Sequence, residues 1–238
     1  MAQHKYSQWY PYLNTQESYN NLSQLPELPR MLCDYLLDAP NGDYTPVDDN
    51  EYARCRFWKY LFYDEAKPLT KKLPTIKEKM SILFDPNKPE TPPTKKGYRL
   101  YPQIWVKQSQ TEAQTRVYVY KGRTVPNDDF KSAIAIHFVI FSHYTYELNT
   151  KATEYDRLIG IEQAIIEAFN GVNMTGVGTF FYSKRKHPDC GSRPIYDKDI
   201  NVGIEVVLGL ELATTYVNDL GKANNMPLLS STMTTRLA

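Results

Sequence analysis

Apolar residues recur along this chain at two spacings, one typical of strands and one typical of helices. Residues 202–212 alternate strictly, which predicts a strand with one buried face and one face in water. Residues 131–146 carry apolar side chains on both faces of a predicted strand. A strand of that kind lies in the middle of a sheet, covered by helices of its own chain or by another subunit.

The best-defined helix is predicted at residues 154–169, with Thr153 and Asp156 as a capping box and Gly171 as the terminating glycine. Its apolar stripe spans an arc of about 160°, broader than a one-sided amphipathic helix needs. Glu162 falls inside this stripe, where a carboxylate needs a donor. It either pairs within its own subunit or reaches solvent, or it forms a salt bridge between subunits. The residues that we expect at a subunit interface are Tyr155, Ile159, Glu162 and Ile166 on this helix and His137 and His143 on the long strand.

The rest of the pattern predicts short helices before residue 96 and strands after it. Prolines are concentrated before residue 103 and break the first region into helices at 26–38, from Asp48 and Asp49 to Pro68, and at 75–85. Shorter strands are expected at 116–120 and 178–184, a turn at 121–122, a polar basic loop at 185–199 and a flexible tail at 214–238. The fold class is therefore α+β: a mainly antiparallel sheet over 97–213, with one amphipathic helix packed across it, preceded by a proline-rich helical region and arm at 1–96.

Composition narrows the choice of partners only slightly. The 28 Lys and Arg residues against 27 Asp and Glu residues give a net charge of +1, so any charge-driven binding is local. The odd number of cysteines, at unrelated spacings, argues against a disulfide framework. No segment has the length of a membrane-spanning helix or a signal peptide, and we expect a soluble protein that is made inside a cell and has no membrane partner.

No motif predicts catalysis, a cofactor or a metal site. His187, Asp189 and Cys190 lie close in sequence, but a structural zinc site needs four ligands. A metal-dependent nuclease is the enzyme alternative, with Asp128, Asp129, Asp189 and Glu205 as its carboxylates; the acid-x-Lys pattern of such enzymes is missing after Glu205.

The best local charge feature is the basic cluster formed by Lys184, Arg185 and Lys186, with Arg193 nearby. Such a cluster is either a solvated loop or a surface for nucleic-acid phosphates in the lumen of a channel, and Lys95, Lys96 and Arg99 could add to it.

Three segments of the sequence resemble a known class of phage protein: GYRLYPQ at 97–103, RLIGIEQAIIEAF at 157–169 and GTFFYSK at 178–184. Together with the order of strands and helix, they resemble tail-terminator-type head-to-tail joining proteins of tailed bacteriophages, and the neck-ring proteins of crAss-like phages. The resemblance implies a structural virion subunit in the neck or tail, with no enzymatic activity. It implies a homo-oligomeric ring that contacts neighbouring portal, ring or tail proteins and lets genomic DNA pass through its lumen. A domain for interaction with the host is a third possibility.

Overall fold

The computed structural model describes residues 26–39, 45–65, 67–84, 97–104, 114–126, 131–143, 156–174, 177–197 and 201–213. Its helices are α2 (Leu28–Leu37), α3 (Asp49–Phe62), the 3-10 turn η2 (Pro68–Thr70), α4 (Ile76–Ser81) and α6 (Arg157–Phe169). Its strands are β1 (Leu100–Tyr101), β2 (Arg116–Pro126), β3 (Lys131–His143), β4 (Asn173–Met174), β5 (Gly178–Phe181), β6 (Gly191–Asp197) and β7 (Asn201–Ala213). The predicted α+β class is confirmed.

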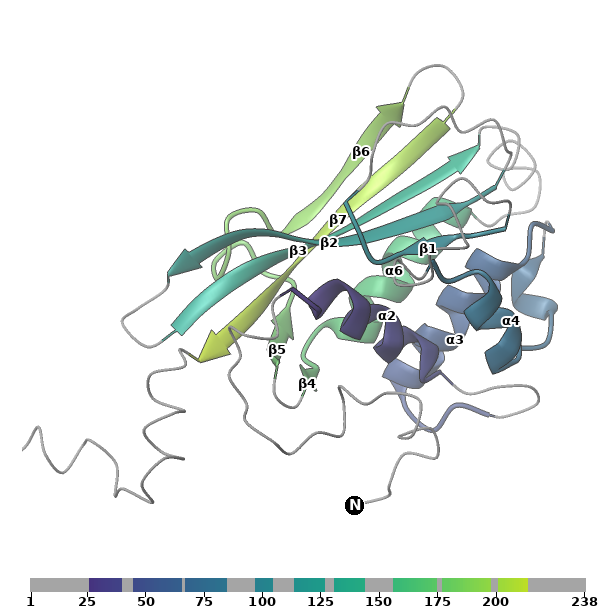
Figure 1. The fold of residues 1–238 in the computed structure, drawn as a ribbon, viewed down its shortest axis with the longest axis horizontal. Helices are drawn as coiled ribbons and strands as arrows, with labels where there is room; N and C mark the ends of the chain where they lie inside the picture. Colours follow the sequence, from purple (N-terminus) through teal and green to yellow (C-terminus); the bar gives the residue numbers. More distant parts are fainter. Residues whose placement is uncertain are drawn as a thin grey trace, which may run out of the picture.

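The strands form one twisted sheet that lies along one side of the molecule (Figure 1). Its order is β1-β2-β3-β7-β5-β4, and β6 pairs with β7 on the same edge as β5. All pairs are antiparallel except β1 with β2. The long strands β3 and β7 therefore form the centre of the sheet, as the apolar pattern predicts for β3.

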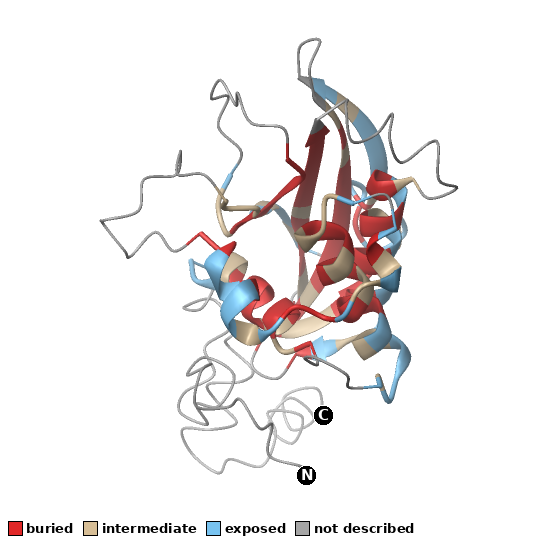
Figure 2. Cartoon of the chain, turned by 90° about the vertical axis from the view of Figure 1, so that its right-hand side faces the viewer, coloured by how far each residue is buried: buried red, intermediate tan, exposed pale blue. Residues whose placement is uncertain are grey.

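The helices cover one face of this sheet (Figure 1). Helix α2 contacts β2, α6 contacts β3 and β7, and α3 packs on α6. Their buried faces are turned toward the sheet (Figure 2). One continuous core joins apolar residues of α2, α3 and α6 with the inward-facing residues of β3 and β7, so the helices before residue 84 fold onto the sheet rather than apart from it.

Helices α3, α4 and α6 begin at capping residues that the sequence signals locally. The Asp48 carboxylate accepts a hydrogen bond from the backbone of Glu51, and Thr75 and Glu78 form a capping box at α4. The cap of α6 is Asp156 itself, which accepts from the Ile159 amide; the prediction made Asp156 the last residue of a box that began at Thr153.

The wide apolar stripe of α6 is covered mostly within the chain. Helix α6 lies between the sheet on one side and α3 on the other, so two of its faces are buried. Gly160 marks the α3 contact, because a β-carbon there would stand 2.5 Å from the Tyr60 ring. Ile159 is the apolar residue of the stripe that stays 44% exposed.

Two arginines fasten the carboxyl end of α3, where backbone carbonyls lack helical partners. The buried guanidinium of Arg157 donates to the carbonyls of Tyr60, Tyr63 and Glu65. Arg99 donates to carbonyls in the last turn of α3 and pairs with Asp64. Arg99 therefore has a structural role at the end of α3, while Lys95 and Lys96, which were named with it, lie outside the described residues.

The second face of the sheet differs from the wet face predicted for 202–212. Glu205 is only 4% exposed and Val207 6%. Tyr101 stacks on Tyr118 at 4.8 Å, and they belong to a second apolar cluster, which covers this face at β1, β2 and β3. The chain thus covers part of this face at β1 and β2, and the part beside β6 and β7 remains open.

Two predicted connections are strands instead. Residues 121–122 do not turn, because β2 continues through them with a register shift between Lys121 and Thr124. The predicted loop 185–199 contains β6, which pairs with β7 from Gly191 to Asp197. The predicted arm at 87–96 and tail at 214–238 lie outside the described residues.

Candidate functional site

A buried carboxylate on the open face of the sheet gathers polar side chains from three other strands. Glu205 of β7 accepts from Arg193 of β6 through Oε2, and its Oε1 lies 2.8 Å from Nδ1 of His137 on β3. The hydroxyl of Tyr120, on β2, donates to the same Oε1 at 3.3 Å. The Tyr120 and His137 rings stack with centroids 4.8 Å apart. We call these four residues the Glu205 cluster.

Strand register explains why these residues meet. Tyr120 is paired with His137 across β2 and β3, and Arg193 with Glu205 across β6 and β7. In the β3–β7 ladder, His137 lies next to the Val139–Glu205 pair on the same face. The cluster is therefore fixed by backbone pairing, although its members are up to 85 residues apart.

Electrostatics favour the ionised form of Glu205 and the protonated form of Tyr120. Burial would raise the pKa of Glu205, but hydrogen bonds from His137 and Arg193 outweigh this and lower it below its ordinary value. Burial and the neighbouring carboxylate raise the pKa of Tyr120 to about 12, so the phenol remains a hydrogen-bond donor at neutral pH. The carboxylate is thus ionised and occupied by donors, which leaves it poorly suited to bind a metal ion.

The cluster borders a hollow of about 500 Å³. Its lining is mainly apolar and consists of Ile104, Tyr120, Val139, Phe141, Arg193, Pro194, Ile195, Tyr196 and Glu205. Ile104 is 60% exposed and Tyr196 76%.

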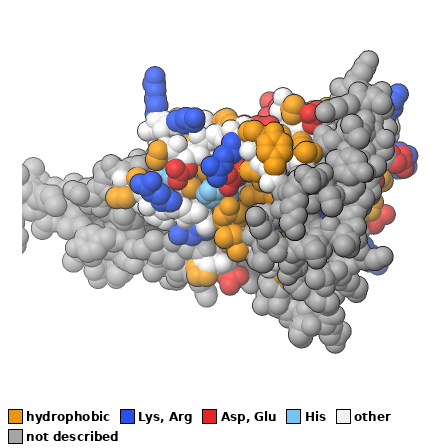
Figure 3. All heavy atoms as spheres, turned by 90° about the horizontal axis from the view of Figure 1, so that it is seen from above, with side chains coloured by type: hydrophobic (Ala, Val, Ile, Leu, Met, Phe, Trp, Pro, Cys, Tyr) orange, Lys and Arg blue, Asp and Glu red, His pale blue; other side chains and the backbone are white. Residues whose placement is uncertain are grey.

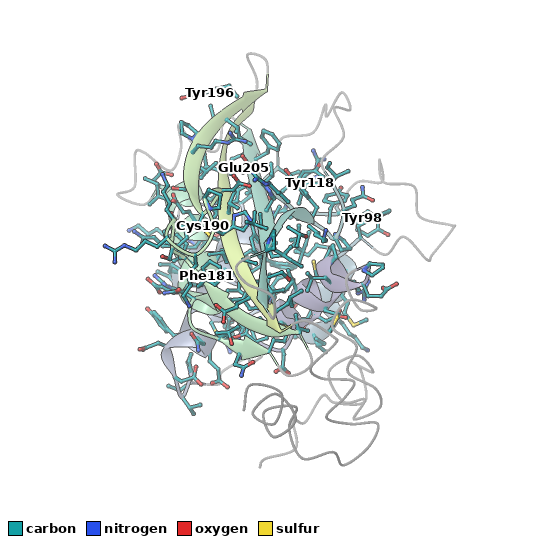
Figure 4. The ribbon with its side chains drawn as sticks, turned by 90° about the vertical axis from the view of Figure 1, so that its left-hand side faces the viewer. Tyr98, Tyr118, Phe181, Cys190, Tyr196 and Glu205 are labelled. Carbon is teal, nitrogen blue, oxygen red and sulfur yellow. The ribbon has the colours of Figure 1, made fainter. Side chains whose placement is uncertain are left out.

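Figure 4 shows how labelled side chains of this face are arranged along the sheet: Tyr196, Glu205, Cys190 and Phe181 lie in a row, with Tyr118 and Tyr98 beside them. Viewed from above, hydrophobic side chains lie directly beside a mixture of basic, acidic and histidine side chains (Figure 3).

This surface has the composition of a binding surface. Exposed tyrosine and arginine side chains beside an apolar hollow are typical of protein interfaces. Three of the cluster residues were predicted for separate reasons: His137 for an interface, Arg193 for DNA and Glu205 for a metal. Tyr120 was missed, although its alternation with Tyr118 places both on one face.

The basic residues predicted as a surface for nucleic-acid phosphates do not form one loop. Lys184, Arg185 and Lys186 are exposed in a turn after β5, whereas Arg193 lies in β6 and binds Glu205. The Lys186 ammonium lies 3.8 Å from the Glu211 carboxylate and 5.1 Å from the centre of the Phe181 ring. The turn and Arg193 therefore present positive charge at separate places, and Arg193 is the one of these residues that pairs with Glu205.

The predicted interface residues of α6 have different environments. Ile159 is exposed, Ile166 packs partly against the core, and Glu162 is half-buried with access to solvent. Tyr155 lies outside the described residues, as does the side chain of His143.

The residues named for metal chemistry are not assembled into a site. His187 is buried and its Nδ1 accepts from the Asp189 amide at 3.2 Å, while Cys190 packs against Phe181 and Ala133. Asp128 and Asp129 lie outside the described residues. Within the part of the chain that the structure describes, no three His, Cys, Asp or Glu side chains gather around a common point. No helix in that part is long and apolar enough to cross a membrane.

The fold and this surface define a one-sided α+β sheet protein with an open face suited to docking. Comparison with known families adds a phage origin: the chain belongs to the YomW family, whose profile matches residues 55–191, more than half of its length. This is a phage-derived family of the Bacillus SPbeta type, so the protein is phage-associated. The matched region runs from α3 to the first residue of β6. No curated protein and no solved structure matches the chain.

Proposed function

We propose that this phage-associated protein is a structural subunit of the virion, which forms a ring in the neck or tail. In this role it joins neighbouring portal, ring or tail proteins, and genomic DNA passes through the lumen. The observation that carries the proposal is the open face of the sheet, where exposed Ile104 and Tyr196 flank an apolar hollow above a buried charge cluster.

The energetics of this face favour a protein neighbour. Covering apolar surface contributes about 25 cal/mol per Å², and aromatic and arginine side chains supply a large share of the binding energy at interfaces. Arg193 is held at Nε by Glu205 while its side chain stays 72% exposed. A partner can therefore contact an oriented guanidinium without disturbing the Glu205 cluster.

A non-catalytic role agrees with the state of the ionisable groups. The Glu205 carboxylate already has three donors, and the three cysteines are free but buried. Burial raises the pKa of each cysteine thiol, which keeps it in the unreactive protonated form. Release of DNA fragments by the purified protein with Mg²⁺ or Mn²⁺, abolished in Asp189→Ala, would contradict this role.

The ring is tested by native mass spectrometry and negative-stain imaging of the full chain over a wide concentration range. We expect closed oligomers, and we expect Ile104→Ser combined with Tyr196→Ser to weaken them. Val47→Ser is the control, because Val47 is as exposed as Tyr196, at 76%, but does not line the hollow. Monomers alone at every concentration, or equal weakening by the control, would contradict the proposal.

A further inference from the structure

A second hollow, on the helical side of the molecule, is lined by basic residues. It has a volume of about 320 Å³ and lies between α3 and the segment from η2 to Leu73. Arg56 and Lys59 line it from the helix, and Lys71 and Lys72 line it from the segment. None of its lining residues is acidic. A concave surface lined by one sign of charge concentrates ions of the opposite sign.

The basic side chains are held in place by the fold. Tyr52, Arg56 and Lys59 recur at helical spacing and therefore lie on one face of α3. The segment opposite is fastened to α3 at two points: the Lys59 ammonium donates to the carbonyl of Leu69, and the Tyr63 hydroxyl donates to the carbonyl of Lys72, both at 3.0 Å. The hollow is thus a preorganised feature of the fold.

Two of the basic side chains of the hollow are paired with carboxylates at its rim. Arg56 pairs with Glu167 and Lys71 with Glu65. These carboxylates are 51% and 60% exposed. Lys71 is itself 40% exposed, so its pair with Glu65 contributes at most about 1 kcal/mol. Arg56 is 19% exposed, so mainly the Glu167 side of its pair faces water. A phosphoryl group, with more charge and more acceptor oxygens than one carboxylate, can replace these carboxylates.

An aromatic ring lies at the same site. Tyr52 is 54% exposed, and the guanidinium of Arg56 lies 5.2 Å from the centre of its ring. Bases stack on exposed aromatic rings in proteins that bind nucleic acids without sequence preference. We propose that the hollow binds a nucleoside phosphate, with its phosphoryl group among Arg56, Lys59, Lys71 and Lys72 and its base on Tyr52.

The ligand is either a free nucleotide or one unit of a single strand, since both present the same chemistry. The proposal does not depend on ring formation. Its site is also separate from the basic turn at Lys184, Arg185 and Lys186.

The test is fluorescence anisotropy of the full-length protein with a labelled oligothymidylate, followed by competition with thymidine monophosphate. We expect saturable binding that weakens about tenfold when Lys71→Gln and Lys72→Gln are combined, equivalent to losing one charge-assisted contact. Competition by the monophosphate identifies the nucleotide as sufficient, whereas strand binding without competition assigns the site to a single strand. Tyr52→Leu should weaken both ligands and leave inorganic phosphate unaffected.

Two controls separate this site from general charge attraction. Lys121→Gln with Arg123→Gln removes the same charge from exposed positions of β2 and should change affinity less than about twofold. Glu65→Gln with Glu167→Gln removes the competing carboxylates and should strengthen binding about two- to fivefold. Circular dichroism checks that each variant is folded. No saturable binding, or equal losses in the two basic double variants, overturns the proposal.

Discussion

Gly122 and His137 fit together so closely that a β-carbon on Gly122 would stand 2.2 Å from Nε2 of the histidine ring. The ring occupies the space that a side chain at position 122 would need. Because β2 shifts register between Lys121 and Thr124, the glycine lies beside the ring at an irregular point of the ladder. This contact holds the ring against Tyr120 and within reach of Glu205.

Replacing Gly122 with alanine should therefore displace the His137 ring. We expect the Tyr120 stack and the bond to Glu205 to break, with a loss of about 1–3 kcal/mol in the free energy of unfolding. Urea denaturation monitored by circular dichroism measures this loss.

A double-mutant cycle with His137→Ala tests the mechanism. Once the ring is gone, Gly122→Ala should cost little, because the added methyl group enters vacated space. An equal cost in both backgrounds would show that Gly122 is required for backbone conformation and not for the ring.

Glu205 should make the stability of the fold sensitive to acid. Its folded pKa is lowered below the ordinary value of 4.5, so it stabilises the fold above that value. The contribution disappears as the pH falls through the folded pKa. Between about pH 5 and pH 3 the free energy of unfolding should fall more steeply in the native protein than in Glu205→Gln.

Glu211→Gln is the matched control, because Glu211 lies on the same face of β7 and is only partly buried. It should keep the steep acid dependence. A Glu205→Gln variant with the native acid profile would show that another carboxylate dominates.

The buried face of β7 was predicted correctly, because local periodicity alone determines it. Alternation in 202–212 assigned the face that packs on α6, because apolar residues at every second position must point to the core. The prediction that the opposite face lies in water was wrong at Glu205, because a glutamate in an alternating strand pattern normally indicates an exposed position. Its burial depends on His137 and Arg193, which reach it only through strand pairing.

Three of the four residues of the Glu205 cluster were predicted as separate site residues, but Tyr120 was missed and the assembly was not predicted. No local signal fixes which residue of β3 lies beside Glu205, because register is set by long-range pairing. Strand β6 was missed because its sequence is typical of a loop, with Arg193, Pro194 and a neighbouring turn. An edge strand tolerates such residues, since one of its sides makes no ladder hydrogen bonds.

Lys79 should make stability rise from neutral to alkaline pH. It is buried and donates to the carbonyl of Ala39, and burial lowers its pKa from 10.5 to about 7. Above pH 7 the folded state releases this proton while the unfolded state keeps it, so the cost of burying the charge disappears. Between about pH 7 and pH 9 the free energy of unfolding should rise by up to about 1.4 kcal/mol per pH unit from this group.

Chemical denaturation of Lys79→Met at the same pH values should lack this rise. Lys77→Met, at an exposed position of the same helix, should retain it. A rise of equal size in both variants would assign the pH dependence to other groups.

Replacing Lys184, Arg185 and Lys186 with alanine should leave folding intact. All three are exposed, so the free energy of unfolding should change by less than about 0.5 kcal/mol. If the turn faces the lumen, particles that carry the variant should retain less DNA, because phosphate contacts are lost. Unchanged DNA content and infectivity would remove the turn from the lumen.

Ile165 and Ile159 offer a direct comparison of two isoleucines on α6. Ile165 is completely buried between the sheet and the helical layer, whereas Ile159 is 44% exposed. Ile165→Ala should lower the free energy of unfolding by about 2–5 kcal/mol, because it leaves a cavity in the shared core. Ile159→Ala should cost less than about 1 kcal/mol in the monomer.

If Ile159 lies at a subunit interface, the Ile159→Ala substitution should weaken the oligomer in native mass spectrometry. A loss below about 1 kcal/mol for Ile165→Ala would mean that the buried face of α6 is assigned incorrectly.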